Sequence, residues 1–281
     1  MITEVNSSFW AHNLSPFLWK FPDSWENWGP GGIRWYGVSY LLGFIVAYSL
    51  LLVSYNRKRS PYDKEQILNL MTFQVLGVLL GGRIGYALLY QTEHLLNDPL
   101  MLFRVWEGGM ASHGGFIGVI LATFWYCRQS NQSFWPVADL IATVVPPGLF
   151  FGRVANFING ELWGTPSTLP WAVLFPNSPG FAEGIARHPS QLYAALLEGL
   201  FLFCLIQLRF WKSGICQKSP GRLGGEFLVA YAGARIFGEI FREPDASLLM
   251  GLSRGQFYSI FLFLGGLLVI HFANKRSKSM V

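Results

Sequence analysis

Long runs of hydrophobic residues, separated by short polar segments, recur along the whole chain. Several runs extend over about 20 residues, the length at which an α-helix crosses a hydrocarbon core of roughly 30 Å. Windows of this length and hydropathy are typical of membrane-spanning helices. The pattern predicts seven of them, at residues 35–54, 67–90, 111–127, 134–151, 190–210, 224–241 and 255–273.

The predicted fold is an all-α, polytopic integral membrane protein, with residues 1–281 forming a single transmembrane domain. The longest segment between predicted spans, 152–189, contains Gly, Pro and Trp and is expected to form a small head outside the membrane. Composition agrees with this fold, since 13% of the residues are charged, against about 25% in soluble domains. No basic segment followed by an apolar run and a cleavage site opens the chain, so we expect no removable signal peptide.

The basic residues predict the orientation of the helices. Short loops rich in lysine and arginine face the cytoplasm in membrane proteins, and more than half of the 21 basic residues fall in loops on one side of the predicted spans. The N-terminus is then external and the C-terminus cytoplasmic. Topology accounts for the net charge of +5, so nucleic acid is not an expected partner. The cytoplasmic set is Arg57, Lys58, Arg59, Lys64, Arg128, Arg209, Lys212, Lys218, Arg222, Lys275, Arg276 and Lys278.

The three cysteines, Cys127, Cys204 and Cys216, lack the spacing of a metal site. The predicted topology places them within a span or at the cytoplasmic side, where disulfides are rare. We expect neither a disulfide nor a bound metal.

Charged side chains inside or beside a span need a compensating role, because one at the helix centre costs about 2.5 to 3.5 kcal/mol on insertion scales. Arg235, Glu239 and Arg242 would share one face of a helix. Two interpretations fit this spacing. Glu239 neutralises both arginines and holds the bundle together, or one arginine stays available for a phosphate, which the guanidinium fork suits. Arg83, inside the second span, is expected to pair with a carboxylate such as Asp139.

A second polar group lies directly after Pro146-Pro147, where Arg153, Asn156, Asn159 and Glu161 fall within thirteen residues that include three glycines. Irregular backbone at membrane depth normally lines a cavity. An ordinary helix-end loop with Asn-Gly turn chemistry is the alternative.

Three further positions have a structural interpretation on their residue types alone. His113, followed by two glycines, is either a packed or capping residue or a general base. Tyr36 in RWYG is typical of the aromatic belt at a membrane interface. The segment RHPSQLY at 187–193 reads as a capped helix start.

These segments together resemble one family, the bacterial phosphatidylglycerol:prolipoprotein diacylglyceryl transferases. The signature of that family is similar to GRVANFINGELWG at 152–164, and the resemblance extends over about residues 33 to 260. The flanking segments occur in the family's order: WYG at 35–37, GGRIGY at 81–86, FRVWEGGMASHGG at 103–115, RHPSQLY at 187–193 and FGEIFREPD at 237–245.

The resemblance implies an enzyme that transfers the sn-1,2-diacylglyceryl group of phosphatidylglycerol to the lipobox cysteine thiol of a prolipoprotein signal peptide. The products are a thioether and glycerol 1-phosphate. No metal or organic cofactor is implied. The resemblance places the enzyme in the bilayer of the bacterial cytoplasmic (inner) membrane, with the active site toward the external, periplasmic face.

The resemblance also implies roles for single residues. His113 is the candidate base for the thiol, while Arg153 and Arg235 would stabilise the departing phosphate. Glu239 would hold an arginine or bind the glycerol hydroxyls. Whether His113 takes the proton or an arginine-rich pocket lowers the thiol pKa stays open at this point. The positions expected to bind substrate are Tyr36, Asn156, Asn159, Glu161, Gly164 and Arg242.

A transporter of an anionic solute is the alternative from another class, because Arg and Glu within the membrane also mark solute pathways. That class predicts similarly interrupted spans in the two halves of the chain, and the sequence shows no such pair.

Overall fold

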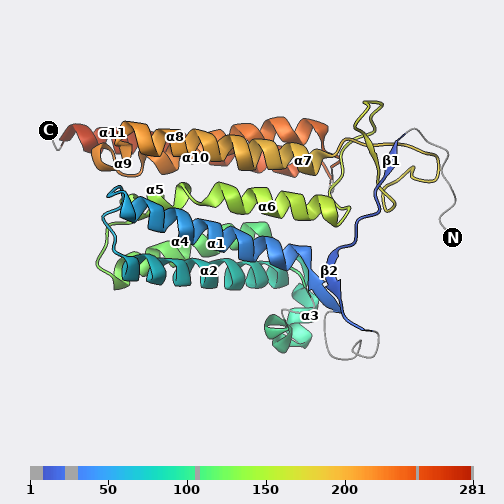
Figure 1. Cartoon of the computed structure of the whole chain (residues 1–281), viewed down its shortest axis with the longest axis horizontal. Coiled ribbons are helices and arrows are strands. Elements are labelled where there is room, and N and C mark those ends of the chain that lie inside the picture. Colours follow the sequence, from blue (N-terminus) through green and yellow to red (C-terminus); the bar gives the residue numbers. More distant parts are fainter. Residues whose placement is uncertain (1–8, 23–30, 105–107, 245–246, 280–281) are drawn as a thin grey trace.

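In a computed structural model the chain is mostly helical, and its long helices lie side by side in one bundle (Figure 1). The structure describes residues 9–22, 31–104, 108–244 and 247–279, together with all their side chains except those of Ser112, His113 and Ser279.

Helices make up most of the described chain. In order they are α1 (Trp35–Asn56), α2 (Lys64–Tyr90), α3 (Thr92–Asn97), η2 (Pro99–Phe103), α4 (Ser112–Gln129), α5 (Phe134–Ala142), α6 (Val145–Ile158), α7 (Ser190–Ala194), η4 (Ala195–Phe201), α8 (Leu202–Ser213), α9 (Ile215–Lys218), α10 (Arg222–Gly238), η5 (Glu239–Phe241) and α11 (Arg254–Ser279). Of these, η2 and η5 are 3₁₀-helices, whereas η4 is a π-helix that joins α7 to α8.

Each of the seven predicted spans falls on helical chain, although 134–151 is divided between α5 and α6, and their number as membrane spans is not confirmed. Within the described chain, four helical segments are long and apolar enough to cross a membrane: α1, α2, the continuous segment Ser190–Ser213, and α11. The helices α5 and α6 pass the same test only as a pair, with a bend of 42° at a short break between them. They add a fifth candidate if the pair is counted as one broken span. The chain is therefore a helical protein with four or five candidate spans.

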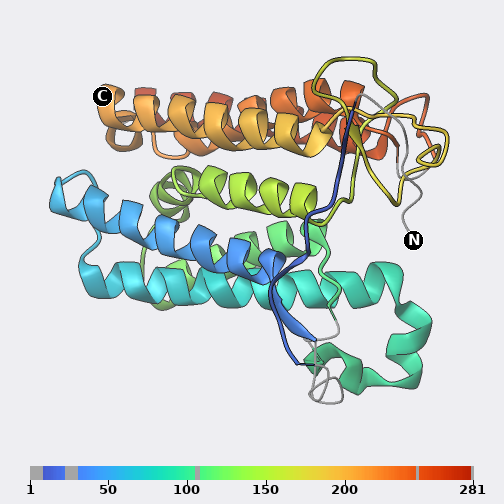
Figure 2. The same ribbon diagram turned by 45° about the vertical axis from the view of Figure 1, so that its right-hand side comes forward.

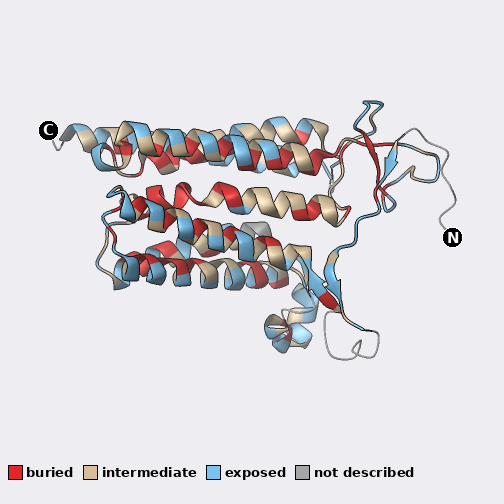
Figure 3. Cartoon of the chain, viewed as in Figure 1, coloured by how far each residue is buried: buried red, intermediate tan, exposed pale blue. Residues whose placement is uncertain are grey.

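The helices form three layers around α6 (Figure 1). On one side α1 packs against α6, with the α2 and α4 pair beyond it. On the other side η4 packs against α6, and α10 packs against both η4 and α11. Buried residues concentrate in the middle of this stack, while the outer faces are exposed (Figure 3). The α3 and η2 helices project away from the bundle (Figure 2).

The contact between α2 and α4 depends on glycine. A Cβ on Gly118 would lie 1.9 Å from the carbonyl oxygen of Gly77, and one on Gly114 would lie 2.2 Å from that of Gly81. Small residues of this kind let two helix backbones approach closely where lipid gives no hydrophobic drive for association. The glycines therefore fix the position of α4 on α2.

The expected pairing of Arg83 with Asp139 is wrong. Arg83 is buried, and its guanidinium donates to backbone carbonyls between residues 101 and 109, including that of Arg104 at 2.8 Å. Asp139 instead accepts hydrogen bonds from the backbone N–H groups of Gly221 and Gly224, both at 2.7 Å, at the start of α10. Carbonyl oxygens can satisfy a buried guanidinium as a carboxylate does, so spacing and charge alone could not identify the partner.

The segment expected to form the external head is partly helical. The α6 helix continues to Ile158, so the irregular part of the 152–189 segment begins at Asn159. One strand pair ties this part to the N-terminal region, and a second lies within that region. The strand β1 (Trp10–Ala11) pairs in parallel with β4 (Val173–Leu174), and β2 (Phe17–Lys20) pairs antiparallel with β3 (Gly32–Arg34). The sequence did not predict these strands, since two to four residues give no alternating pattern.

Replacing Gly118 with valine should destabilise the bundle, because the added atoms would overlap the backbone of α2. Overpacking of this kind costs about 1 to 3 kcal/mol, so the melting temperature in detergent should fall. Gly265→Val on α11 is the matched control, since a Cβ there meets no atom within 4 Å. Equal melting temperatures for the two variants would show that the close α2–α4 contact does not contribute to stability.

Candidate functional site

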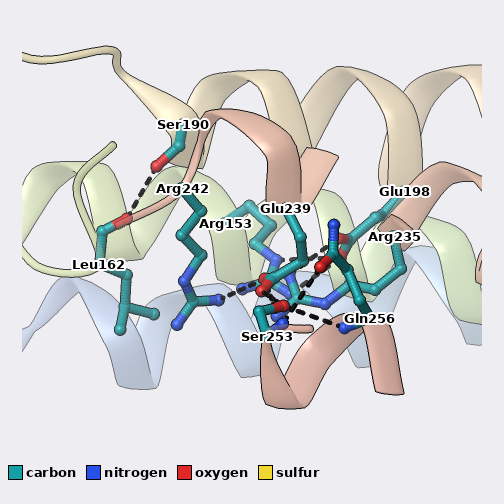
Figure 4. A network of polar contacts seen from close by, with 9 residues as sticks. All are labelled: Arg153, Leu162, Ser190, Glu198, Arg235, Glu239, Arg242, Ser253 and Gln256. Carbon is teal, nitrogen blue, oxygen red and sulfur yellow. Dashed lines mark hydrogen bonds and ion pairs between the residues drawn. The ribbon is translucent and has the colours of Figure 1, made fainter. Parts of the chain in front are cut away.

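Glu198 joins two arginines from different helices in the interior of the bundle (Figure 4). Its Oε2 accepts from Nε and Nη2 of Arg153 on α6, at 3.1 and 2.8 Å. Its Oε1 accepts from Nη1 of Arg235 on α10, at 3.1 Å. The Glu198 side chain is 1% exposed. A single buried carboxylate therefore sets the positions of both guanidinium groups.

Glu239 forms a second junction beside the first. Its Oε1 lies 2.6 Å from Nη2 of Arg235 and 3.4 Å from Nη1 of Arg242, and its Oε2 accepts from the Ser253 hydroxyl at 2.5 Å. Gly255 leaves the space for this carboxylate, because a Cβ there would lie 2.5 Å from its carboxyl carbon. Glu239 thus contacts both Arg235 and Arg242, as both interpretations of their spacing assume.

Arg242 does not share a helix face with Arg235, contrary to the expectation from spacing. The α10 helix ends at Gly238, η5 ends at Phe241, and Arg242 is extended with φ −94° and ψ 138°. Its backbone forms an isolated β-bridge with Gly164. A Cβ on Gly164 would lie 2.4 Å from the carbonyl oxygen of Phe241 and 2.6 Å from that of His188. Glycine at this position therefore lets the signature segment sit directly against the chain that carries Arg242.

Asn156, in the last turn of α6, and Asn159 and Glu161, which follow the helix, form a polar group separate from the arginine cluster. Asn156 and Asn159 donate from Nδ2 to the same oxygen of Glu161, at 2.8 and 3.2 Å. Gln191 on α7 donates to the Glu161 carbonyl at 2.6 Å. The contacts recorded for these three predicted residues stabilise the turn and connect it to α7. These contacts fit the predicted helix-end turn, whereas Arg153 and Leu162 are the residues of the segment that line a cavity.

The segment RHPSQLY ties the turn to the end of η5. Arg187 is buried and donates to the Gly164 carbonyl at 3.1 Å and to Glu243 at 3.0 Å. The His188 ring packs against Tyr193 and Phe241. Burial lowers the pKa of His188 below its ordinary value, which favours the neutral ring. The segment is thus more than a helix start, because it contacts both the signature segment at Gly164 and the chain after η5 at Glu243.

A small cavity opens beside the arginines. Its volume is about 10 Å³, which is room for no more than one water molecule. A headgroup could enter only if the walls moved apart. The residues that line it are Arg153, Leu162, Ser190, Gln191, Ala194, Arg235, Gly238 and Arg242.

Two predicted site residues lie outside this network as far as the structure describes it. Tyr36 stands in the first turn of α1, where its ring contacts that of Tyr40 at 5.5 Å between centroids and its carbonyl accepts from Ser39. His113 belongs to the first turn of α4, but its side chain falls outside the described part of the structure. Their roles stay predictions.

Glu198 was missed by the sequence analysis, although its neighbours were found. Its signal was present, since it is the one acid in the apolar run 193–204. An ionisable residue inside a span is by default a candidate for function. The surrounding π-helix could not be read from sequence, although such turns occur often at functional sites. Gly199 adds to the local fit, because a Cβ there would lie 2.6 Å from that of Phe150 on α6.

Comparison with known proteins gives a consistent result. Residues 24–272 match the family described as "Prolipoprotein diacylglyceryl transferase". A phosphatidylglycerol–prolipoprotein diacylglyceryl transferase of Cereibacter sphaeroides is 43% identical over 259 residues, covering 84% of this chain and 88% of the relative. Proteins of the same name from Idiomarina loihiensis and Pseudoalteromonas atlantica are 44% and 41% identical, covering 92% and 98% of this chain and 96% and 94% of the relatives.

Replacing Glu198 with glutamine should destabilise the protein strongly. The change leaves two largely buried arginines without their shared counter-charge, and loss of one partner of a buried ion pair costs about 3 to 5 kcal/mol. Glu226→Gln is the matched control. Glu226 also bridges two arginines, but both of those side chains are 38% exposed, where pairs contribute about 0 to 1 kcal/mol. Melting temperatures in detergent would compare them, and an equal decrease would contradict a special role for Glu198.

Proposed function

Because the chain belongs to the prolipoprotein diacylglyceryl transferase family, we propose that its cluster of three arginines and two glutamates binds the phosphate of phosphatidylglycerol. The chain is an enzyme of lipoprotein modification that transfers the diacylglyceryl group from phosphatidylglycerol to prolipoproteins. No finding supports the alternative of an anion transporter. The observation that carries the proposal is the convergence of Arg153 and Arg235 on buried Glu198 beside a cavity that Arg242 also lines.

The charge of the cluster suits a phosphodiester. The cluster itself contains three guanidinium groups and two carboxylates, so cationic donors outnumber acids where the singly charged lipid phosphate would bind. Glu198 and Glu239 would hold the arginines before substrate arrives, so little reorganisation is needed when charge develops. Guanidinium groups can donate to two phosphate oxygens at once. The cavity is narrow, so headgroup binding would have to displace its Leu162 wall.

The proposed step is alkylation of sulfur. The lipobox thiolate attacks the glyceryl carbon attached to phosphate, a carbon–sulfur bond forms, and the carbon–oxygen bond to phosphate breaks. The electron pair of the broken bond leaves with glycerol 1-phosphate. Negative charge therefore grows on the phosphate in the transition state, and Arg153 and Arg235 would stabilise it there more than in the bound substrate.

Two routes could remove the thiol proton. His113 could accept it as a general base, or the nearby arginines could lower the thiol pKa from its ordinary value of about 8.5. We assign the proton to His113, because a base near the operating pH is efficient in such transfers. The first turn of α4 is held in place by the glycine contact with α2.

The remaining site residues are proposed to position the substrates. Arg242 lines the cavity and lies on the chain that packs against Gly164. Asn156, Asn159 and Glu161 shape the turn that carries the Leu162 wall. Tyr36 is assigned to the headgroup by resemblance.

We propose seven spans for the topology, with the N-terminus external and the C-terminus cytoplasmic. The α4 helix packs along α2, and α10 packs along α11, so both would share the membrane with helices that are candidate spans. The irregular segment from Asn159 to Pro189 would form the external head. We place the enzyme in the cytoplasmic membrane of a bacterium, with the arginine cluster toward the external side, and propose the lipobox cysteine as acceptor.

Arg153→Ala should lower the rate of transfer about 100-fold to 1000-fold, the usual loss when a donor to a developing anion is removed. The assay follows thioether formation between phosphatidylglycerol and a synthetic lipobox peptide by mass spectrometry. Arg209→Ala is the matched control. Arg209 pairs with Glu226 near the C-terminal end of α8, whereas Glu198 precedes that helix. Wild-type activity in a well-folded Arg153→Ala protein would contradict the proposal.

His113→Gln should show a changed pH profile. If His113 takes the proton, the variant loses about 100-fold or more in rate at neutral pH. Its activity should recover as the pH approaches about 8.5, where the thiolate forms without a base. A profile with the wild-type shape would instead assign the lowered thiol pKa to the arginines.

A further inference from the structure

A second concave site lies at the end of the bundle opposite to α7. It is a groove of about 340 Å³, within the range of ligand sites. The C-terminal part of α11 and the start of α5 form its walls, and both lie at the same end of the molecule (Figure 1). The lining residues are Trp135, Leu268, Val269, Phe272, Lys275 and Arg276.

The groove has an apolar wall and a cationic end. Leu268 and Phe272 are one helical turn apart and are exposed, so they form an apolar stripe along α11. Lys275 and Arg276 follow in the next turn. The Arg276 guanidinium stands over the Trp135 ring, 4.4 Å from its centroid. Tryptophan is enriched where a membrane protein crosses from hydrocarbon to headgroups.

Two of the carboxylates near this end, Asp139 and Glu226, are engaged by groups other than those that line the groove. Asp139 accepts from two backbone N–H groups at the start of α10. Glu226 pairs with Arg209 at 2.7 Å and with Arg222 at 3.1 Å. Two arginines thus share one carboxylate, and Lys275 and Arg276 add further positive charge. The cationic end of the groove therefore attracts an anion.

We propose that this groove binds one anionic phospholipid, with an acyl chain along Leu268 and Phe272 and its phosphate at Lys275 and Arg276. The combination of features selects this ligand. A free phosphate has no apolar part to cover the Leu268 and Phe272 wall. A zwitterionic lipid would bring no net negative charge to the basic end. Basic pockets between membrane helices bind anionic headgroups in this way. The groove is separate from the transfer site, so the bound lipid would bridge α5 and α11 and need not be a substrate.

Photo-crosslinking of the full-length protein in phosphatidylcholine vesicles tests the proposal. The probes are phosphatidylserine and phosphatidylcholine that carry the same diazirine acyl chain, with labelled residues located by peptide mass spectrometry. Phosphatidylserine is anionic but lacks the glycerol headgroup of the substrate. We expect it to label residues 268–272 roughly 30-fold more than phosphatidylcholine does, the factor that two basic residues contribute near a membrane.

Variants distinguish a specific lipid site from non-specific electrostatic attraction of anionic lipid to the protein. Lys275→Gln combined with Arg276→Gln should abolish the preference for the anionic probe. Lys58→Gln combined with Lys64→Gln is the matched control, since it removes the same charge from the α1–α2 loop and the first residue of α2 at the same end (Figure 1) and should leave the preference intact. Arg153→Ala should also leave it intact, whatever its effect on transfer. Equal labelling by both probes, or an equal loss in the control pair, would overturn the proposal.

Discussion

The structure depends on the pairing of opposite charges inside a bundle of apolar helices. Arg153, Arg235 and Glu198 each carry a cost in a membrane, and that cost is offset only when all three meet in one geometry. Glu198 gives one oxygen to each arginine. The helices α6, η4 and α10 must therefore keep fixed positions relative to one another. A π-helix at Glu198 and the absent side chain of Gly199 are local features that permit this meeting.

The parts of the chain outside the bundle serve the same centre. The signature turn is closed by Glu161, and Gly164 lets the turn pack against the segment that follows η5. Arg187 joins that segment to the turn through Glu243 and the Gly164 carbonyl. Arg242 is thereby held next to Glu239 and the cavity. A reaction that places charge on a departing phosphate needs such fixed donors, because donors that reorganise during the step lose much of their effect.

The sequence predicted where helices lie and most of the charged cluster, because apolar length and the cost of membrane charge are both readable along the chain. It failed where partners come from distant segments. Arg83 was assigned to Asp139, yet backbone carbonyls satisfy it. Glu198 was overlooked within an apolar run, and Arg242 left the helix that its spacing suggested. The short strands show no alternating hydrophobic pattern, because backbone contacts between distant segments form them.

The central claim is that Arg153 and Arg235 hold the lipid phosphate. The most direct measurement is the magnetic dipolar coupling between guanidinium nitrogen and lipid phosphorus, by solid-state NMR of the protein with phosphatidylglycerol and no acceptor peptide. An Arg276→Gln background removes any contribution from the groove on α11. We predict coupling at roughly 4 Å, the separation expected for a guanidinium hydrogen-bonded to phosphate, that weakens when either arginine is replaced by lysine. Coupling that is absent, or unchanged by both replacements, would contradict the account.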